Sequence, residues 1–397
     1  MPNGWACKEL SSFCNIQKGT QYDRTLLNNE GTYPCINGGI EPSGYVESWN
    51  TKANTIIISE GGNSCGYVNW IKSNFWADSH CYRLLDIDSE IDVRFLYFAM
   101  KSQQQYIMDL RVGSGLPNIQ KKAISEFTLC FPSSINEQQR IATTLTTMDE
   151  AIGQTEALIN KYTNVKTGLM QDLLTHGIDE NGNIRSEQTH KFKDSPLGRI
   201  PDEWECVELE MMMKPIDAQP DHRTPTEVVD GYPYVGISDI DELGNLSLDK
   251  CRKVDMSVVL KQQKAFQIEE GDIIFGKIGT IGKPKILPIT KEPYALSANV
   301  ILIKPYEYSP FLFYTLNSNY IKTEVELAIH STSQPAFGME KIRKLLIKKP
   351  KGKECNKIIS ILMQIDAVIQ SNEISLNKCK SQREGLLHDL LTGKVRV

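Results

Sequence analysis

The sequence lacks the motifs by which most enzymes are identified. Its six histidines are isolated, and neither H-E-x-x-H nor another paired metal-ligand spacing is present. The Gly-rich segment after Phe275 does not fit a phosphate-binding loop, because Lys277 stands where the first glycine belongs and Pro284 where the hydroxyl belongs. The Asn/Asp-Pro-Pro-aromatic tetrad of amino-methylating enzymes is also missing. We therefore expect no catalytic residues in this chain, and no metal or cofactor bound by it.

Long apolar runs and clustered cysteines are missing as well. No run approaches the ~20 residues of a membrane helix, and Met1 to Trp5 lack the basic-then-apolar layout of a signal peptide. The ten cysteines are scattered without a C-x-x-C pair, which favours small core residues in a reducing compartment over a disulfide framework or a zinc site. We expect a cytoplasmic protein without a membrane partner.

The net charge of the chain limits the kind of surface that the protein can have. The net charge of −5 argues against a protein covered with phosphate-binding groups. It does not exclude nucleic acid, because local patches decide such contacts.

What the sequence does contain is a large duplication. Pro2 and Trp5 recur as Pro201 and Trp204 at an offset of 199. The segment 137–175 then matches 354–392 at an offset of 217 without a gap. Two long copies are not a solenoid of short repeats, and they indicate two similar bodies with a pseudo-two-fold axis and paired binding surfaces.

The second part of each copy has the pattern of a coiled coil. Steps of alternately four and three residues from Ile141 and from Ile358 meet apolar residues at eight of ten positions in each copy. A helix over 137–175 would be about 58 Å long at 1.5 Å per residue. Two antiparallel helices would bring the polar breaks Thr155 and Asn372 together near the axis, where they would fix the register. The alternative is an amphipathic helix packed on its own domain. The predicted interface residues are Ile141, Leu145, Met148, Ile152, Thr155, Ile159, Ile358, Leu362, Ile365, Ile369, Asn372 and Leu376.

The first part of each copy alternates short β-rich runs with Gly, Asn and Pro, which is typical of strands and turns. The sequence thus predicts an α+β protein: two similar mixed α/β domains separated by a long antiparallel two-helix coiled coil, with a pseudo-two-fold internal duplication. We expect domains at 1–131 and 200–349, long helical regions at 132–178 and 350–397, and a linker at 179–199.

The loops of the two domains differ more than their framework. The Gly-rich segment after Phe275 suits a loop that follows a strand, where glycine lets backbone approach a ligand and Lys or Thr can address phosphates or bases. A tight turn between core strands is the plainer interpretation, and both can hold together. Residues 341–353 carry seven basic groups, which predict either a solvated strand edge or a phosphate contact.

At this point the chain resembles the specificity subunit of type I restriction–modification systems. The resemblance covers essentially the whole length and includes a Pro-x-x-x-x-x-x-Ile approach to each long helix. Its other motifs are Ile200-Pro201-Asp202-Glu203-Trp204, Glu137-Gln138-Gln139-Arg140-Ile141, Leu173-Leu174-Thr175 and Leu390-Leu391-Thr392-Gly393. The second helical motif departs from the pattern, because Cys355, Asn356 and Lys357 follow Glu354. The N-terminus also starts almost directly at the Pro-x-x-Trp motif.

The resemblance implies two target recognition domains, each reading one half of a bipartite asymmetric site in double-stranded DNA. It implies that the coiled coil sets the spacer and that two methylation subunits and the restriction subunits assemble around it. S-adenosylmethionine, ATP and magnesium would be bound by those partners. A specificity subunit of another, type II-like modification assembly is one alternative. The other is a coiled-coil scaffold with two protein-binding heads that does not bind DNA.

Direct readout would place amide, hydroxyl and basic side chains of the domain tips in the major groove. Loop placement and side-chain chemistry select the candidates. For the first domain they are Gln21, Asn37, Asn63, Ser64, Asn69 and Asn118, and for the second Ser238, Asp239, Lys277, Thr280, Lys283, Ser333 and Gln334.

Overall fold

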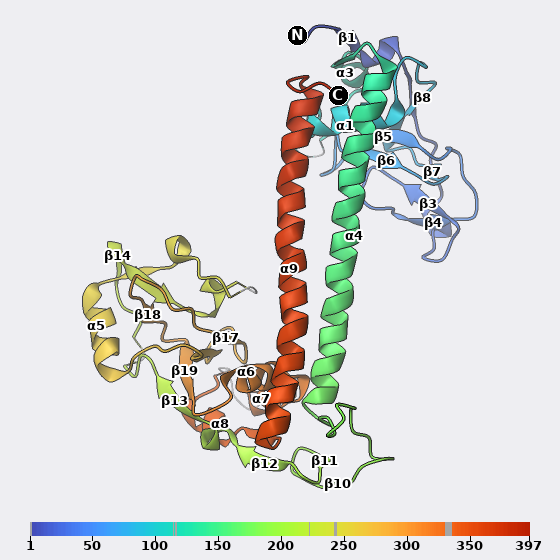
Figure 1. The fold of residues 1–397 in the computed structure, drawn as a ribbon. Helices are drawn as coiled ribbons and strands as arrows, with labels where there is room; N and C mark the ends of the chain where they lie inside the picture. Colours follow the sequence, from blue (N-terminus) through green and yellow to red (C-terminus); the bar gives the residue numbers. More distant parts are fainter. Residues whose placement is uncertain (1, 114, 116, 222, 242–243, 330–335) are drawn as a thin grey trace. The chain divides into compact units, whose positions relative to one another are not determined.

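The structure is a computed structural model that describes residues 2–113, 115, 117–221, 223–241, 244–329 and 336–397 (Figure 1). It divides into two compact units, one of residues 1–157 with 374–397 and one of residues 158–373. Among the described residues, no helix combines the length and the apolar character that a membrane span requires. Each unit contains a globular head and a part of both long helices, so the sequence crosses between the units twice.

The first unit carries the first head, which consists of strands β1–β9 and helices α1–α3. The strands are β1 (Trp5–Glu9), β2 (Asn15–Lys18), β3 (Tyr33–Ile36), β4 (Gly44–Val46), β5 (Thr55–Ser59), β6 (Val68–Ile71), β7 (Trp76–Ala77), β8 (Cys81–Leu85) and β9 (Thr128–Pro132). The helices are α1 (Val93–Ser102), α2 (Gln104–Asp109) and α3 (Lys121–Ser125), with 3₁₀ turns at Leu10–Ser12 and Arg24–Leu26.

The second unit carries the second head, which consists of strands β12–β20 and helices α5–α8. The strands are β12 (Glu205–Glu208), β13 (Met213–Asp217), β14 (Glu227–Val235), β15 (Lys253–Val254), β16 (Ile273–Gly276), β17 (Pro284–Ile286), β18 (Ala295–Leu296), β19 (Val300–Pro305) and β20 (Leu346–Lys349). The helices are α5 (Met256–Ala265), α6 (Ser309–Asn317), α7 (Asn319–Ile329) and α8 (Met339–Lys344), with 3₁₀ turns at Leu209–Met211, Ile237–Asp239 and Leu248–Lys250.

The two heads share one strand order, which confirms the duplication predicted from the sequence. A four-stranded antiparallel sheet has the order β2-β8-β5-β6 in the first head and β13-β19-β16-β17 in the second. A three-stranded sheet follows as β4-β3-β7 and β15-β14-β18, and a two-stranded one as β1-β9 and β12-β20. Helix α5 is specific to the second head, because the first head passes from β4 to β5 through a short loop.

Local sequence explains the central elements of the heads. The run of β-branched residues in β5 is buried throughout, as expected for a strand covered on both faces. Helix α1 begins where the carboxylate of Asp92 accepts hydrogen bonds from the backbone N–H groups of Arg94 and Phe95, both at 3.0 Å. Such a cap satisfies donors that have no partner within the helix.

The two long helices are α4 (Ile135–Leu173) and α9 (Gly352–Leu391), and they pack together within each unit. In the first unit, α4 and α9 run in opposite directions, since Asp149 pairs with Arg383 at 2.5 Å and Glu156 with Lys380 at 2.8 Å. In the second unit, Lys166 of α4 pairs with Asp366 of α9 at 2.6 Å. The antiparallel pairing predicted from the heptads is therefore present in both units.

All twelve predicted interface residues are buried or half-buried. The predicted pairing of Thr155 with Asn372 would join the two units, and it stays a prediction. Thr155 donates to the carbonyl of Ala151 and Asn372 to that of Val368, both at 2.7 Å, so each bonds within its own helix. The other polar breaks in the heptads are Lys166 and Arg383, and these make the inter-helix ion pairs. A Thr and an Asn near a helix carbonyl are satisfied locally, whereas long charged side chains reach across the seam.

Both long helices complete the core of each head. The first core contains Ile141 and Leu145 from the start of α4 together with Leu390 from the end of α9. The second contains Leu173 from the end of α4 and Ile358 from the start of α9. Neither sequence copy therefore supplies the whole core of one head.

The cysteines were predicted to be small core residues in a reducing compartment, and one pair departs from this prediction. Cys7 and Cys130 are joined by a disulfide between β1 and β9, where the two residues stand opposite each other. Their separation of 123 residues left no signal in the spacing. At the corresponding place in the second head, Cys206 stands opposite Lys348. Most of the free cysteines are buried, as predicted, and burial raises the pKa of Cys14 and Cys355 to about 12.

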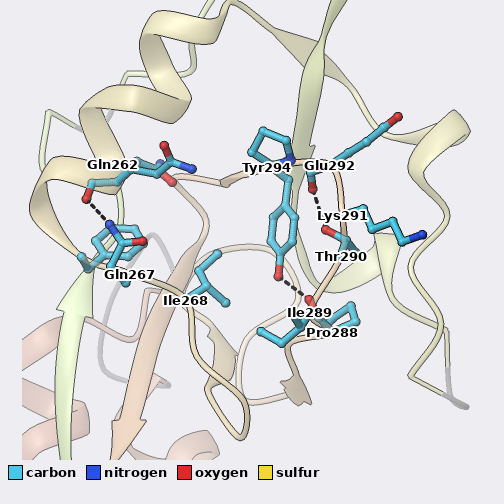
Figure 2. Close-up of a pocket in the computed structure, with 12 residues that line it drawn as sticks. Gln262, Gln267, Ile268, Pro288, Ile289, Thr290, Lys291, Glu292 and Tyr294 are labelled. Atoms are coloured by element: carbon cyan, nitrogen blue, oxygen red, sulfur yellow. Dashed lines mark hydrogen bonds between the residues drawn. The ribbon is translucent and has the colours of Figure 1, made fainter.

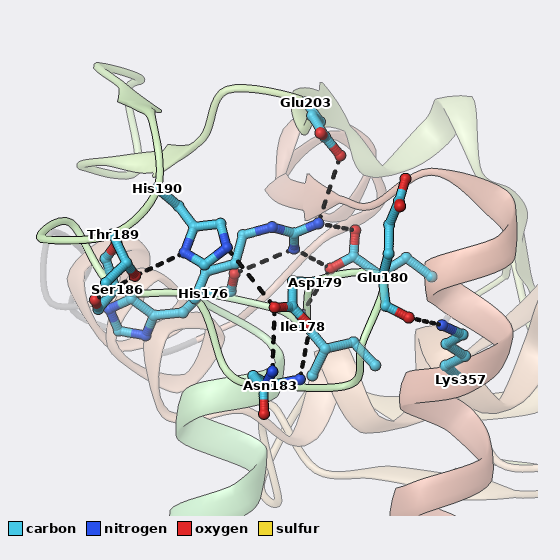
Figure 3. A network of polar contacts seen from close by, with 12 residues as sticks. His176, Ile178, Asp179, Glu180, Asn183, Ser186, Thr189, His190, Glu203 and Lys357 are labelled. Carbon is cyan, nitrogen blue, oxygen red and sulfur yellow. Dashed lines mark hydrogen bonds and ion pairs between the residues drawn. The ribbon is translucent and has the colours of Figure 1, made fainter.

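The predicted linker 179–199 is part of the second unit's folded structure. Its strand β10 (Phe192–Lys193) pairs with β11 (Ile200–Pro201), which directly follows the linker. Within the network in Figure 3, Asp179 lies between Asn183 and His190, and Glu180 accepts a hydrogen bond from Lys357 at 3.0 Å.

The guanidinium of Arg185 anchors this segment to the start of α9. It forms a bidentate ion pair with Glu354, and the side chains are only 9% and 10% exposed. The same carboxylate accepts a hydrogen bond from the backbone of Ile178 at 2.9 Å and from the indole of Trp204 at 2.9 Å. The first unit repeats the arrangement, because Arg396 pairs bidentately with the buried Glu137 at the start of α4.

Substitution Arg185→Met should strongly destabilise the second unit, because it leaves the buried carboxylate of Glu354 without its cation. The expected loss is about 3–5 kcal/mol in the free energy of unfolding, measured by urea denaturation. Arg199→Met is the matched control, since Arg199 and Glu187 are half-exposed and such a pair contributes at most about 1 kcal/mol. Equal effects of the two substitutions would contradict a structural role for the buried pair.

Candidate nucleic-acid interface

Five loops meet at one end of the four-stranded sheet in the first head. They are residues 19–22, 37–39, 60–67, 78–80, 111–113 and 117–119. The amide of Gly19 donates to the carbonyl of Cys81 at 2.9 Å, that of Glu60 to His80 at 2.9 Å, and that of Gly62 to Pro117 at 3.1 Å. Backbone hydrogen bonds thus join segments that lie far apart in the sequence, and we call this group the first loop cluster.

A glycine permits the closest approach in the first loop cluster. A Cβ at Gly19 would lie 1.9 Å from the carbonyl oxygen of Asp78, which no other residue could accommodate without a shift of backbone. Asp78 is itself buried and accepts a hydrogen bond from the amide of Tyr22 at 3.1 Å. The loop that follows Lys18 is therefore held rigidly against the β7–β8 turn.

A buried carboxylate stands at the centre of the first loop cluster. Glu60 accepts hydrogen bonds from the ammonium of Lys18 at 2.7 Å and from the hydroxyl of Tyr82 at 3.1 Å. The Nδ1 atom of His80 lies 3.8 Å from the same carboxylate. Burial first, and then the charge of Glu60, raise the pKa of Tyr82 to about 12, so the hydroxyl keeps its proton as the donor.

Side chains of helices α1 and α2 also contact loop 60–67 and strand β6, which follows it. Gln104 donates to the carbonyl of Gly66 at 2.8 Å, and Lys101 donates to that of Val68 at 2.9 Å. The ammonium of Lys101 lies 3.5 Å from the centre of the Tyr67 ring. Desolvation lowers the pKa of Lys101 to about 8, and the nearby charge of Arg383 adds to this effect.

The second head has a matching loop cluster at the same end of its sheet. The amide of Lys277 donates to the carbonyl of Asn299 at 2.8 Å, and that of Phe337 to the carbonyl of Lys277 at 2.9 Å. Gly276 is required at the turn, since a Cβ there would lie 1.7 Å from the carbonyl oxygen of Thr280. The Gly-rich segment is thus a tight turn after a core strand. Together with the neighbouring loops it forms the second loop cluster, which consists of residues 236–239, 276–283, 297–299 and 336–337.

Most predicted residues of the first domain lie in the first loop cluster. Gln21 and Asn63 are exposed, while Asn37, Ser64 and Asn118 are half-buried. Asn118 pairs in a β-bridge with Gly61, which brings the loops of Asn63, Ser64 and Asn118 together. Asn69 differs, because it lies within strand β6 and its amide donates to the carbonyl of Ile40 at 3.4 Å.

The predicted residues of the second domain are less uniform. Ser238, Thr280 and Lys283 are exposed in the second loop cluster. Asp239 accepts a hydrogen bond from the amide of Gly236 at 2.8 Å, so its carboxylate caps a turn. Lys277 is buried and paired with Asp217 at 2.9 Å, which gives it a structural role. Ser333 and Gln334 lie outside the described residues.

Sequence reasoning missed three exposed side chains in the loop clusters. Lys18 is the strand residue that borders the first cluster, His80 lies within that cluster, and Asn299 takes the place of His80 in the second. Lys18 ends a strand, and only the order of the sheet shows that this end meets the loops. A basic residue directly before a glycine was the available signal, and it is a weak one.

The basic segment 341–353 has partly structural roles. Lys341 donates to the carbonyl of Ala328 at 2.9 Å, and Lys344 pairs with Glu340 at 2.8 Å. Lys348 is buried in β20 beside the ring of Tyr320. A phosphate contact of the remaining basic groups stays a prediction.

A cavity of about 270 Å³ lies in the second head between α5 and residues 288–294 (Figure 2). The hydroxyl of Tyr294 donates to the carbonyl of Pro288 at 2.9 Å and shapes this loop. Gln262, Gln267 and Ile268 line the opposite side. Among the described residues, no group of three or more His, Cys, Asp or Glu side chains is arranged to hold a metal ion.

The two heads have the same topology, and each packs on the antiparallel helices α4 and α9. Their loops differ at equivalent ends of the sheets. These features define a class of protein that presents two related binding surfaces. The sequence places the chain within that class. Residues 2–163 and 201–380 both match the type I restriction modification DNA specificity domain, and the chain belongs to this family.

Curated relatives agree with this assignment. The chain is 26% identical over its whole length to the type I restriction enzyme MjaVIII specificity subunit of Methanocaldococcus jannaschii, and the match covers 94% of that protein. It is 37% identical over 156 residues to a protein of Mycoplasma genitalium whose name describes a type I specificity subunit, and 34% identical over 182 residues to one of Mycoplasma pneumoniae. The matches span 40% and 48% of the lengths of these two proteins.

The fold is similar to that of solved structures. The S subunit of a type I restriction-modification system from M. genitalium matches with a TM-score of 0.69 and 22% identity, covering 98% of this chain and 97% of that one. A chain from a study of complex assembly in the type I R-M system matches with a TM-score of 0.52 and 14% identity. These likenesses concern the fold.

The lowered pKa of Lys101 predicts a specific dependence of stability on pH. Between pH 8 and 10 the unfolded chain binds more protons at this site than the folded chain does, so this site makes the protein more stable as the pH rises. Lys101→Met should remove this increase in stability. In urea denaturation, the free energy of unfolding of the wild type should therefore exceed that of the variant by an amount that grows with pH. Lys101→Arg, which stays charged, should also remove it and be the less stable variant. Parallel curves for wild type and both variants would contradict the prediction.

Proposed function

We propose that this chain is the DNA-binding specificity subunit of a type I restriction–modification complex. Each head binds one half of a bipartite asymmetric site in double-stranded DNA, and α4 and α9 set the spacer between the halves. The observation that carries the proposal is the pair of loop clusters, which share a framework and differ in chemistry. A lysine faces a buried glutamate in one cluster, and an aspartate faces a buried lysine in the other.

Direct readout by the loop clusters is the proposed mechanism. Major-groove edges differ between base pairs in their donors and acceptors, so exposed amide, hydroxyl and ammonium groups can distinguish them. The candidates for base contacts are the exposed or half-exposed predicted residues, apart from Asn69, which lies in strand β6, and Asp239, which caps a turn. These candidates are Gln21, Asn37, Asn63, Ser64 and Asn118 in the first head, and Ser238, Thr280 and Lys283 in the second.

The proposed partners are two methylation subunits and the restriction subunits. The duplicated helices favour two methylation subunits, because a pseudo-two-fold pair of surfaces binds two copies of one partner. S-adenosylmethionine, ATP and magnesium would be held by those partners, and the assembly would work in the cytoplasm. The family match supports this assignment.

Exchange of residues 1–131 for the same domain of another family member should change one half of the methylated site and leave the other half and the spacer unchanged. The exchanged domain should retain the apolar surface that meets Ile141, Leu145 and Leu390, since these complete its core. Methylome sequencing of cells that also express the methylation subunits measures the outcome. The reciprocal exchange of 200–349 is the control, and it should change the other half. A change in both halves from either exchange would overturn the proposal.

Insertion of seven residues into each long helix should lengthen the spacer and preserve both half-sites. Insertion after Ala157 and after Ile374 adds one heptad at equivalent points and keeps the seam in register. Seven residues add about 10 Å of helix, which allows a longer spacer by up to about three base pairs. Methylome sequencing again gives the readout. An unchanged spacer with altered half-sites would contradict the role of the helices.

A further inference from the structure

The two loop clusters contain the same ion pair with its charges reversed. Lys18 is the last residue of β2 and Asp217 the last of β13, and these strands are equivalent in the two sheets. Glu60 and Lys277 each follow the equivalent strands β5 and β16. Each pair therefore occupies the same site in its head, joined at 2.7 Å in the first and 2.9 Å in the second.

The reversal changes which charge reaches the surface. In the first head the carboxylate of Glu60 is buried at 8% exposure, while the side chain of Lys18 is 51% exposed. In the second head the ammonium of Lys277 is buried at 6% exposure, and its partner Asp217 is 17% exposed. Only the first head presents a half-exposed ammonium group at this position.

Glu60 is itself immobilised by several elements. Its carboxylate accepts the hydroxyl of Tyr82, its amide donates to the carbonyl of His80, and its carbonyl accepts the amide of Ile119 at 2.8 Å. An ammonium bound to a fixed carboxylate has lost much of its rotamer freedom before any ligand arrives. Binding a further acceptor then costs less entropy, which is the usual benefit of preorganisation.

We propose that Lys18 is a specificity-determining residue of the first head, that it reads a guanine in the major groove, and that Glu60 is its positioning residue. This inference rests on the function proposed above. An ammonium group has three donors and no acceptor, and one donor is directed at Glu60. Guanine presents two acceptors, O6 and N7, on its major-groove edge, which suits the remaining donors.

The buried carboxylate favours a base contact over a phosphate contact. A lysine that binds phosphate acts as a mobile point charge, and its full charge drives the attraction. The adjacent carboxylate offsets the charge of Lys18 and leaves N–H donors in fixed directions. His80 borders the same site with 54% of its side chain exposed. In the second head the exposed neighbour is Asn299, so that head reads its DNA by other groups.

Lys18→Met in the full chain, expressed with its methylation subunits, tests the proposal by methylome sequencing. We expect relaxation at one G·C position in the half-site read by the first head, with about a ten-fold or greater loss of preference. The half-site of the second head should stay unchanged. Lys72→Met is the matched control, because Lys72 is an exposed lysine that directly follows β6 and lies outside the first loop cluster. It should leave both half-sites intact.

Two further variants separate reading from positioning. Lys18→Arg should keep a preference for guanine, because a guanidinium can also donate to O6 and N7. Glu60→Gln keeps the shape of the side chain and should relax the same base pair as Lys18→Met, with no further loss in the double variant. If Glu60→Gln does not fold, the comparison of Lys18→Met with Lys18→Arg still tests whether Lys18 reads a guanine.

Full retention of the half-site in Lys18→Met would overturn the inference. The variant could also retain the half-site while its DNA binding depends less on salt, by about one released counterion. This result would assign Lys18 to a phosphate contact and would also overturn the inference. Failure of the proposed function would look different. The exchange of residues 1–131 would then leave the methylated site unchanged or alter both halves.

Discussion

Both heads depend on a buried glutamate at the start of a long helix. Glu137 lies in the first turn of α4 and Glu354 in the first turn of α9, and each is held bidentately by an arginine from the segment that follows the other long helix. A carboxylate near a helix N-terminus is favoured by the helix dipole, but its burial requires a cation. The arginine supplies that cation and ties the end of one helix to the start of the other. The apolar ends of both helices then close each core.

With the framework fixed in this way, the loops can change without loss of the fold. The ion pair at the end of each four-stranded sheet is an example. Both of its charges are reversed between the two heads, and the distance between the charged atoms changes only from 2.7 to 2.9 Å. The same framework also accepts helix α5 in the second head and a disulfide in the first. Different surfaces on one framework are what a protein needs to recognise two unlike targets.

The duplication and the heptads predicted the long helices and the shared framework, because both features are periodic in the sequence. Side-chain roles in the loop clusters were harder to predict. Lys277 looked like an exposed reading group because its partner Asp217 lies 60 residues earlier in the chain. Lys18 was overlooked because the order of strands in the sheet decides which strand ends meet. Thr155 and Asn372 each make a hydrogen bond within their own helix, which the heptad pattern did not indicate.

The presence of Leu390 in the first core has a consequence for how the protein is made. A ribosome completes residues 1–145 long before it reaches Leu390, and the roughly 245 residues between them take about 10–50 s to synthesise. The first head emerges early with an apolar gap in its core, which stays open until Leu390 is added. The second core has all its buried residues as soon as Leu362 is added. The N-terminal head is therefore the last to reach its final packing.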